Sequence, residues 1–301
     1  MYYYLLFGMI IESDIDFPQL VKAEKTEADI VIKSGTMPKE LYDYEKECGS
    51  SLGNKISWLI NTYCYLYVEN GSVITYELKE KGTLSMVRNY LMGWGISMLG
   101  LQRGINAMHC SVVASDKGAI LISGESGSGK STLTNMFLDK GWKLMADDMA
   151  YVQTKDSGDV MVYPAFPHQK LCRDAALRKG YDLDELIYLG EDKDKFFVPY
   201  KGEFVLHEMP VKALIILGRH KGDEVVTEEA QGFNKFLGCV NNLFLRHILG
   251  QERYSGIPAR ESFRMAEGIR VFRIVRPVEG DTLQEVTQKA MTIVEDIVKD
   301  M

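Results

Sequence analysis

A glycine-rich segment, GESGSGKS at residues 124–131, has the residue types of a phosphate-binding loop and matches the pattern G-x-x-x-x-G-K-[ST] in full. Its glycines let backbone N–H groups turn inward around phosphate oxygens. Lys130 would reach the β- and γ-phosphates, and the Ser131 hydroxyl would bind Mg²⁺. The alternative is a plain Gly/Ser surface turn. The apolar run GAILIS before the segment and a helical pattern after it favour the phosphate loop.

The whole loop and the start of the following helix are therefore predicted to hold a nucleotide. The predicted contacts are Gly124, Glu125, Ser126, Gly127, Ser128, Gly129, Lys130, Ser131 and Thr132.

Two adjacent aspartates, Asp147 and Asp148, follow the apolar run WKLMA. Two neighbouring carboxylates can divide the work of phosphoryl transfer, one in the metal shell and the other taking the proton of an acceptor hydroxyl. The alternative is a solvated turn after a strand. Ligands of open α/β sheets bind beyond the carboxyl ends of the strands, which favours the functional interpretation.

His109 stands upstream in QRGINAMHCSVVA. A single histidine in an apolar setting is more often a hydrogen-bonded core residue than a catalyst, so its own surroundings do not decide its role.

Taken together, MHCSVV, GESGSGKS and GWKLMADD resemble the catalytic domain of HPr kinase/phosphorylase, the bacterial enzyme that phosphorylates a serine of a small carrier protein. The resemblance lies in order and spacing as well as in residue type. It implies active-site roles for His109 and Lys130, Mg²⁺ binding by Ser131, and proton acceptance by Asp148. Asp147 is implied as its neighbour in the metal or substrate shell.

The chain also has an apolar opening strand, a helical pattern that runs into QRG before the histidine, and the Pro-containing stretch VMVYPAFPHQKL after the Asp pair. With these features it resembles, over most of its length, stand-alone HPr-kinase-related proteins, which include kinases of lasso-peptide precursors. The motif core of this resemblance is specific, whereas the terminal parts do not identify the acceptor. The chain lacks the later E-x-R-G-L-G-type segment of the HPr enzyme, so phosphorolysis is not expected, and its different N-terminal part argues against HPr as substrate. HPr kinases are hexamers, which raises a homo-oligomer as a further expectation.

The predicted fold is α/β: a P-loop kinase domain of the HPr kinase C-terminal type (PEP-carboxykinase-like), residues 105–301, preceded by a small α+β domain, residues 1–104. In the first domain we expect a small antiparallel sheet and a helix. The second should contain a β-loop-α-β unit around the glycine-rich segment. The predicted strands are 2–11, 28–33, 57–68, 69–78, 118–123, 142–146, 211–217 and 271–275, and the predicted helices are 84–101, 130–140, 233–248 and one from about 281.

Composition excludes some classes of function. The 35 basic and 42 acidic residues give a net charge of −7, which argues against an electrostatic hold on nucleic acid or on an anionic membrane. The five cysteines are scattered without CxxC spacing, which favours a reducing cytoplasm. The apolar start meets acidic residues too early for a membrane span, so we interpret it as a buried strand.

Several cations outside the motifs could touch phosphate. Lys195, in a charged loop with Lys193 and Lys201, is the preferred candidate for covering the transferred phosphoryl group. The alternative for all three is a solvated loop. Arg103 could contact phosphate or cap a helix end, and Arg246 could reach the site or extend along an apolar helix.

The sequence therefore predicts a cytoplasmic, ATP- and Mg²⁺-dependent kinase that acts on a serine hydroxyl of a peptide or small protein. One alternative is a small-molecule kinase, for which Arg103, Arg173 and Arg246 could line an acidic-substrate pocket. Another is a nucleotide-sensing binding module with negligible turnover.

Overall fold

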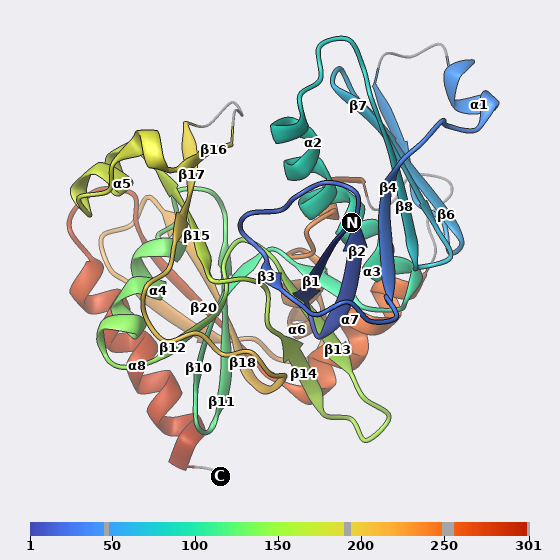
Figure 1. The fold of residues 1–301 in the computed structure, drawn as a ribbon. Helices are drawn as coiled ribbons and strands as arrows, with labels where there is room; N and C mark the ends of the chain where they lie inside the picture. Colours follow the sequence, from blue (N-terminus) through green and yellow to red (C-terminus); the bar gives the residue numbers. More distant parts are fainter. Residues whose placement is uncertain (45–47, 190–193, 249–255, 300–301) are drawn as a thin grey trace. The chain divides into compact units, whose positions relative to one another are not determined.

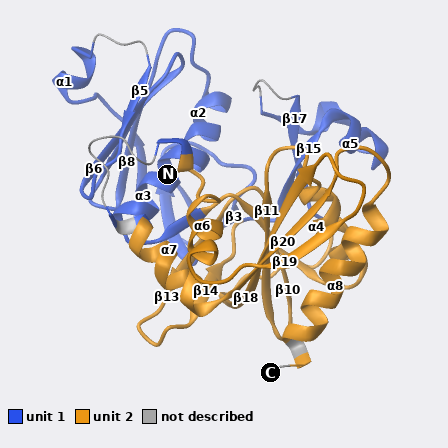
Figure 2. Cartoon of the chain, turned by 180° about the vertical axis from the view of Figure 1, so that it is seen from behind, with its two compact units in different colours: residues 1–107, 166–201, 247–258 blue, residues 108–165, 202–246, 259–301 orange. Residues whose placement is uncertain are grey.

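The fold was determined as a computed structural model that describes residues 1–44, 48–189, 194–248 and 256–299. It is a mixed α/β protein with three sheets (Figure 1). Its contacts group the chain into two compact units. Unit 1 holds residues 1–107, 166–201 and 247–258, and unit 2 holds residues 108–165, 202–246 and 259–301 (Figure 2). The expected domain boundary between residues 104 and 105 remains a prediction.

Unit 1 is built on an eight-stranded sheet in the order β3-β1-β2-β4-β8-β7-β6-β5. The prediction of a small antiparallel sheet was wrong, because β4 lies between β2 and β8 and is parallel to both. The strands are β1 (Tyr2–Leu6), β2 (Met9–Ser13), β3 (Val21–Lys22), β4 (Ile30–Ser34), β5 (Gly49–Ser51), β6 (Ile56–Ile60), β7 (Cys64–Glu69) and β8 (Val73–Leu78).

Local turn chemistry divides two of the predicted strands. Phe7 and Gly8 both have positive φ, as in the two-residue turn of a hairpin, so residues 2–11 form β1 and β2. The Asn61 side chain accepts the N–H groups of Tyr63 and Cys64 at 2.8 and 2.9 Å, which separates β6 from β7. Asn70 and Gly71 both have positive φ and form the turn between β7 and β8, so the predicted strand 69–78 begins only at Val73.

The predicted helix at 84–101 is present but interrupted. It consists of α2 (Leu84–Tyr90), a π-helical turn η1 (Leu91–Gly95) and α3 (Ile96–Gln102). Glycine lowers helix propensity, and the π turn falls where Gly93 and Gly95 stand. The remaining elements of unit 1 are α1 (Lys39–Tyr42), β15 (His168–Cys172), α5 (Arg173–Arg178), η2 (Leu183–Glu185), β16 (Ile187–Tyr188) and β17 (Lys195–Pro199). β9 (Asn106–Met108) crosses from unit 1 into unit 2.

The sheet of unit 2 has a parallel centre. β11 (Gly118–Gly124), β18 (Met209–His220) and β20 (Arg270–Pro277) are parallel neighbours. β10 (Cys110–Ser115) pairs antiparallel with β11, and β12 (Lys143–Ala146) pairs antiparallel with β10. β19 (Val226–Glu229) lies beside β20, and the hairpin of β13 (Ala150–Thr154) and β14 (Val160–Tyr163) joins the start of β18.

Helices cover both faces of this sheet. α4 (Lys130–Asp139) and α8 (Leu283–Lys299) lie on one face (Figure 1) and share a buried core with β11, β18 and β20. On the opposite face, α6 (Phe233–Val240) packs so closely that a Cβ at Gly238 would lie 2.9 Å from the Val271 side chain. α7 (Ile257–Gly268), which the sequence patterns did not indicate, precedes β20, and η3 (Arg246–Ile248) follows α6.

The predicted end of the helix after the glycine-rich loop is confirmed. Gly141 has φ 87°, and the N–H groups of Gly141 and Trp142 donate to the carbonyls of Leu138 and Phe137 at 3.0 and 3.1 Å. This is the pattern of a left-handed helix cap. The Trp142 ring then packs edge-on against Phe137, with ring centroids 5.2 Å apart. The chain therefore passes from the cap directly into β12.

Replacing this cap glycine should destabilise the protein through backbone strain alone. A Cβ at Gly141 would meet no atom within 4 Å, so Gly141→Ala is expected to lower the free energy of unfolding by about 1 kcal/mol. The measurement is urea unfolding followed by circular dichroism. Gly256→Ala is the control, because Gly256 has open space and no left-handed φ, and its change should stay within about 0.5 kcal/mol. An equal change in the free energy of unfolding for both substitutions would contradict the assignment of backbone strain at Gly141.

Candidate active site

The three sequence motifs, those of His109, the glycine-rich loop and the Asp pair, lie at one edge of the sheet of unit 2. β11, β18 and β20 are parallel, so their carboxyl ends share this edge. β10 runs the other way, and its first residue, Cys110, pairs with Ser123 near the end of β11. β12 ends with Ala146, which pairs with Val112 of β10. The residue before β10 and the residues after β11 and β12 therefore meet at one edge: His109, the glycine-rich loop and Asp147-Asp148.

The glycine-rich loop joins β11 to α4, in the predicted strand-loop-helix order. All three of its glycines have positive φ, among them Gly127 at 79°. Gly124 has φ 139°, and a Cβ there would lie 2.3 Å from the carbonyl oxygen of Leu217 on β18. Gly129, the cap of α4, has φ 110°. Larger residues rarely adopt these conformations. The Ser128 N–H donates to Glu125 O at 3.1 Å and closes the loop.

Lys130 is the first residue of α4, and its side chain turns back over the loop. The ammonium group donates to the carbonyl oxygens of Gly124 and Glu125, the latter at 3.3 Å. Ser131 and Thr132 follow in the first helical turn with exposed side chains. The cation and both hydroxyls therefore lie at the N-terminal end of α4.

The loop fits a phosphate chain on two observations. The Ser128 side chain is buried, with 2% of the residue exposed, and its Oγ has no hydrogen-bond partner among the described residues. A Cβ at Gly124 would lie 2.8 Å from this Oγ, so glycine at that position keeps the hydroxyl from being crowded. The first N–H groups of a helix also lack partners within the helix and carry a partial positive charge. These donors, together with Lys130, match the acceptor oxygens of a polyphosphate.

The two aspartates have different surroundings. Asp147 Oδ1 accepts a hydrogen bond from the Ser111 hydroxyl on β10 at 2.6 Å. Asp148 has φ 72°, a left-handed conformation that aspartate tolerates better than most residues. Its Oδ1 lies 3.9 Å from His109 Nδ1, with the side chains 20% and 40% exposed. This distance exceeds a hydrogen bond but allows electrostatic attraction when the imidazole is protonated.

His109 is held by the segment that follows α6. Its N–H donates to the carbonyl of Asn242 at 2.7 Å, and its ring lies edge-on to Phe244 at 5.8 Å between centroids. The Ser123 hydroxyl lies 2.6 Å from both His109 O and Asn242 Oδ1. Asn242 in turn donates to Gly238 O of α6 at 2.7 Å. The backbone of His109 is therefore held by Asn242 and Ser123, and its ring is positioned by Phe244.

The sequence did not predict this positioning. Residues 233–248 were expected to form one helix, and this was wrong because α6 ends at Val240. The chain then makes an isolated antiparallel bridge between Leu243 and Met108. Tertiary pairing with the residue before His109 thus overrides an apolar helical pattern. Asn242 and Phe244 carried no recognisable signal, since both fit a helix.

Cys110 lies beneath the site and is fully buried. Burial raises the pKa of its thiol well above the usual range; Lys130 lowers that pKa, while Asp147 and Asp148 raise it. These effects place the lysine and both aspartates within electrostatic reach of one sulfur atom.

The other predicted cations are held by their own neighbours. Arg103 donates to the carbonyl oxygens of Gly71 and Asp29, both in unit 1, and so supports that unit. Arg246 donates to Asn241 Oδ1 at 3.0 Å. Arg173 of unit 1 forms a two-point ion pair with Asp194.

The lysines of the charged loop are not brought to the glycine-rich loop by any described contact. Lys195 begins β17 opposite Cys172, and the Lys201 ammonium lies 5.9 Å from the centroid of the Tyr181 ring. Both belong to unit 1. Lys193 lies outside the described residues. A role for any of them in phosphoryl transfer remains a prediction.

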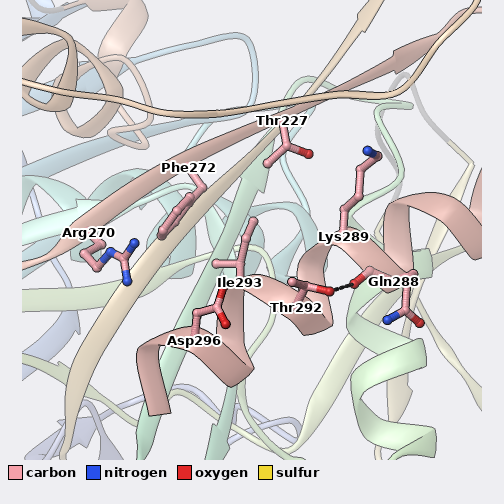
Figure 3. A pocket seen from close by; sticks show the side chains of 8 residues that line it. All are labelled: Thr227, Arg270, Phe272, Gln288, Lys289, Thr292, Ile293 and Asp296. Carbon is pink, nitrogen blue, oxygen red and sulfur yellow. Dashed lines mark hydrogen bonds between the residues drawn. The ribbon is translucent and has the colours of Figure 1, made fainter. Parts of the chain in front are cut away.

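A separate pocket of about 250 Å³ lies where α8 packs near β19 and β20 (Figure 3). Its two cations are matched, because Arg270 pairs with Glu229 and Lys289 with Glu285. Arg270 begins β20 and Arg276 lies near its end at the loop edge, roughly 20 Å of strand away. The pocket is therefore distinct from the candidate active site. Its lining residues are Thr227, Arg270, Phe272, Gln288, Lys289, Thr292, Ile293 and Asp296.

Comparison with protein-family models gives no match, and comparison with curated proteins gives none. Among solved structures, the chain is similar to a structure of the Hpr(Ser) kinase/phosphatase from Coxiella burnetii, at 16% identity and a TM-score of 0.31. The match covers 65% of this chain and 97% of that one. A likeness at this level assigns no activity, so the function is inferred below from the site residues. No helix within the described ranges has the length and apolarity to cross a bilayer.

The burial of three of the five cysteines predicts which thiols of the native protein react with an alkylating agent. Burial raises the pKa of Cys64 and Cys239 to about 12 and that of Cys110 above its usual range. A raised pKa leaves almost no thiolate at pH 8, and the thiolate is the reactive form. Iodoacetamide should therefore modify the exposed Cys48 and Cys172 first, as mapped by mass spectrometry of tryptic peptides.

Unfolding in urea is the control, since all five thiols should then react at similar rates. Rapid alkylation of Cys110 in the native protein would contradict the prediction, because it would show that this thiol is accessible to solvent.

Proposed function

We propose that the protein is a kinase that uses ATP and Mg²⁺ to phosphorylate a serine hydroxyl of a peptide or small protein. The observation that carries the proposal is the antiparallel pairing of β10 with β11 and β12, because His109 and Asp147-Asp148 then lie at the sheet edge where β11 ends and the glycine-rich loop begins. This is where open α/β sheets bind their ligands.

Nucleotide binding is assigned to the loop and α4. The backbone N–H groups of the loop and the Lys130 ammonium would bind the β- and γ-phosphates, and Lys130 would exchange its present bonds to Gly124 O and Glu125 O for phosphate oxygens.

Metal binding is assigned to Ser131 and Asp147. Within the described ranges, no cluster of three or more His, Cys, Asp or Glu side chains could hold an ion unaided. Mg²⁺ commonly takes one or two protein ligands and completes its shell with water and substrate phosphates, so two protein oxygens fit it. When bound, Mg²⁺ would neutralise charge on the β- and γ-phosphates.

Transfer is assigned to Asp148 as general base. The acceptor hydroxyl gives its proton to the Asp148 carboxylate while its oxygen bonds to the γ-phosphorus, and the bond from that phosphorus to the β–γ bridging oxygen breaks to release ADP. His109, 3.9 Å from Asp148, would orient that carboxylate and, when protonated, favour its ionised form.

The choice of acceptor rests on different observations. The order and spacing of His109, GESGSGKS and the Asp pair resemble those of serine-phosphorylating HPr kinases. The three arginines that the sequence suggested for a small acidic substrate are engaged elsewhere: Arg103 by carbonyl oxygens, Arg173 by Asp194, and Arg246 by Asn241. A peptide hydroxyl therefore suits the site better than a small carboxylate metabolite.

Lys130→Ala should weaken ATP binding at least tenfold, about 1.4 kcal/mol, because it removes the only side-chain cation assigned to the β- and γ-phosphates. Isothermal titration with Mg-ATP measures the effect, and phosphoryl transfer should disappear. Lys140→Ala, at the other end of α4, is the matched control and should bind as the wild type does. Equal affinity of the Lys130 variant and the wild type would remove the loop as the nucleotide site.

Asp148→Asn should lower kcat by roughly 10² to 10⁴-fold while the ATP affinity stays within about threefold, because the amide keeps the shape but cannot accept the proton. Asparagine also tolerates the left-handed backbone at this position. Asp116→Asn, in the turn at the far end of β10, is the control. Undiminished transfer by Asp148→Asn would exclude Asp148 as the base.

The acceptor is found by incubating the peptides and small proteins encoded beside this gene with Mg-ATP and either the wild type or Asp148→Asn. Mass spectrometry should show a phosphate gain on serine with the wild type only. Transfer to a small metabolite instead would favour the small-molecule kinase. Tight nucleotide binding with no transfer to any acceptor would favour the sensing module.

A further inference from the structure

Arg276, near the end of β20, contacts the outer side of the glycine-rich loop. Its Nε donates to Ser128 O at 3.3 Å and its Nη2 to Gly127 O at 3.4 Å. Its Nη1 donates to Pro277 O at 3.0 Å. One half-buried guanidinium group therefore joins two successive loop carbonyls to the end of a core strand.

A second arginine stands beside it. Arg219 of β18 is in register with Arg276 on the neighbouring parallel strand. A Cβ at Gly127 would lie 3.7 Å from Arg219 Nη1, so this guanidinium also reaches the loop. Neither arginine forms an ion pair with any residue that the structure describes, whereas Arg173, Arg264 and Arg270 all do. Two positive charges that no described carboxylate pairs with thus lie beside the loop.

The peptide geometry connects these contacts to ligand binding. In a trans peptide the N–H points away from the C=O. When Arg276 holds Gly127 O on the outside, the Ser128 N–H of the same peptide plane is turned to Glu125 O. When it holds Ser128 O, the Gly129 N–H is directed to the opposite side of the loop, where the nucleotide phosphates are proposed to bind.

We propose that Arg276 is a positioning residue for the nucleotide that does not touch the phosphates. It fixes two loop peptide planes: one keeps the Ser128 N–H on Glu125 O and so holds the loop closed, and the other directs the Gly129 N–H at the phosphates. Arg219 adds a second positive charge beside Gly127 and strengthens binding through the electrostatic field. This inference rests on the proposed function, because it requires that the loop binds nucleotide.

ADP binding to the intact chain tests the proposal without any transfer reaction. Arg276→Met should raise the Kd for ADP about tenfold, and Arg276→Lys should fall between that variant and the wild type, since an ammonium keeps the charge but lacks the planar fork. Arg219→Met should weaken binding about two- to threefold at low salt and not at 0.5 M salt, because an exposed charge is screened. Arg273→Met, exposed on the same strand, is the matched control and should bind as the wild type does.

Kinetics separates positioning from general damage. With a phosphorylated acceptor identified, Arg276→Met should raise the KM for ATP with kcat within twofold, the pattern of lost uniform binding. A lower kcat with unchanged ADP affinity would overturn the proposal, as would wild-type ADP affinity of Arg276→Met.

The two proposals fail in different ways. If the wild type itself binds no ADP, the proposed function is wrong and this inference is wrong with it. If the wild type binds ADP and Arg276→Met does not fold, Arg276→Lys is used as the test variant. An ADP affinity at least threefold below that of the wild type supports the positioning role, and an ADP affinity equal to that of the wild type overturns it.

Discussion

The antiparallel pairing of β10 with both β11 and β12 is the constraint on which the rest of the site depends. Because β10 runs against its neighbours, its first residue stands where theirs end. A parallel strand at this place would put His109 at the opposite edge, far from the loop. Backbone hydrogen bonds of buried strands therefore set the distance between residues that lie tens of positions apart in the chain.

The loop separates two electrostatic faces. On its outer side, carbonyl oxygens of Gly127 and Ser128 are satisfied by Arg276, and Gly124 is held against the backbone of β18. The Ser128 N–H is taken by Glu125 O, so the Gly129 N–H, the N-terminal end of α4 and Lys130 remain for the inner side. The same loop contains a buried hydroxyl, that of Ser128, which has no hydrogen-bond partner within the part of the chain that the structure describes. Such groups are costly in a folded protein unless a ligand or water satisfies them, which agrees with a site built for an acceptor-rich ligand.

Local patterns predicted the parts of the site that local chemistry controls. The strand-loop-helix order around residues 118–139 follows from an apolar run, three glycines and a helical pattern, and the helix ends at a left-handed Gly141, directly after the predicted range 130–140. Predictions failed where pairing between distant segments decides. Residues 233–248 have an apolar helical pattern, yet the chain leaves the helix after Val240 to pair Leu243 with Met108. The N-terminal sheet was expected to be antiparallel, but β4 is inserted parallel between β2 and β8, which no local signal encodes.

The sequence by itself determined the residue types that could bind phosphate and accept a proton, because these depend on the chemistry of Lys130, Ser131 and the Asp pair and on the conformational freedom of glycine. Only the tertiary structure decided which residues support them. The supporting residues come from separate strands and turns. Ser111 contacts Asp147, Asn242 and Phe244 contact His109, and Arg276 contacts the glycine-rich loop. Their roles follow from strand register and packing, which are set by the burial of whole elements and not by the residues next to them in the sequence.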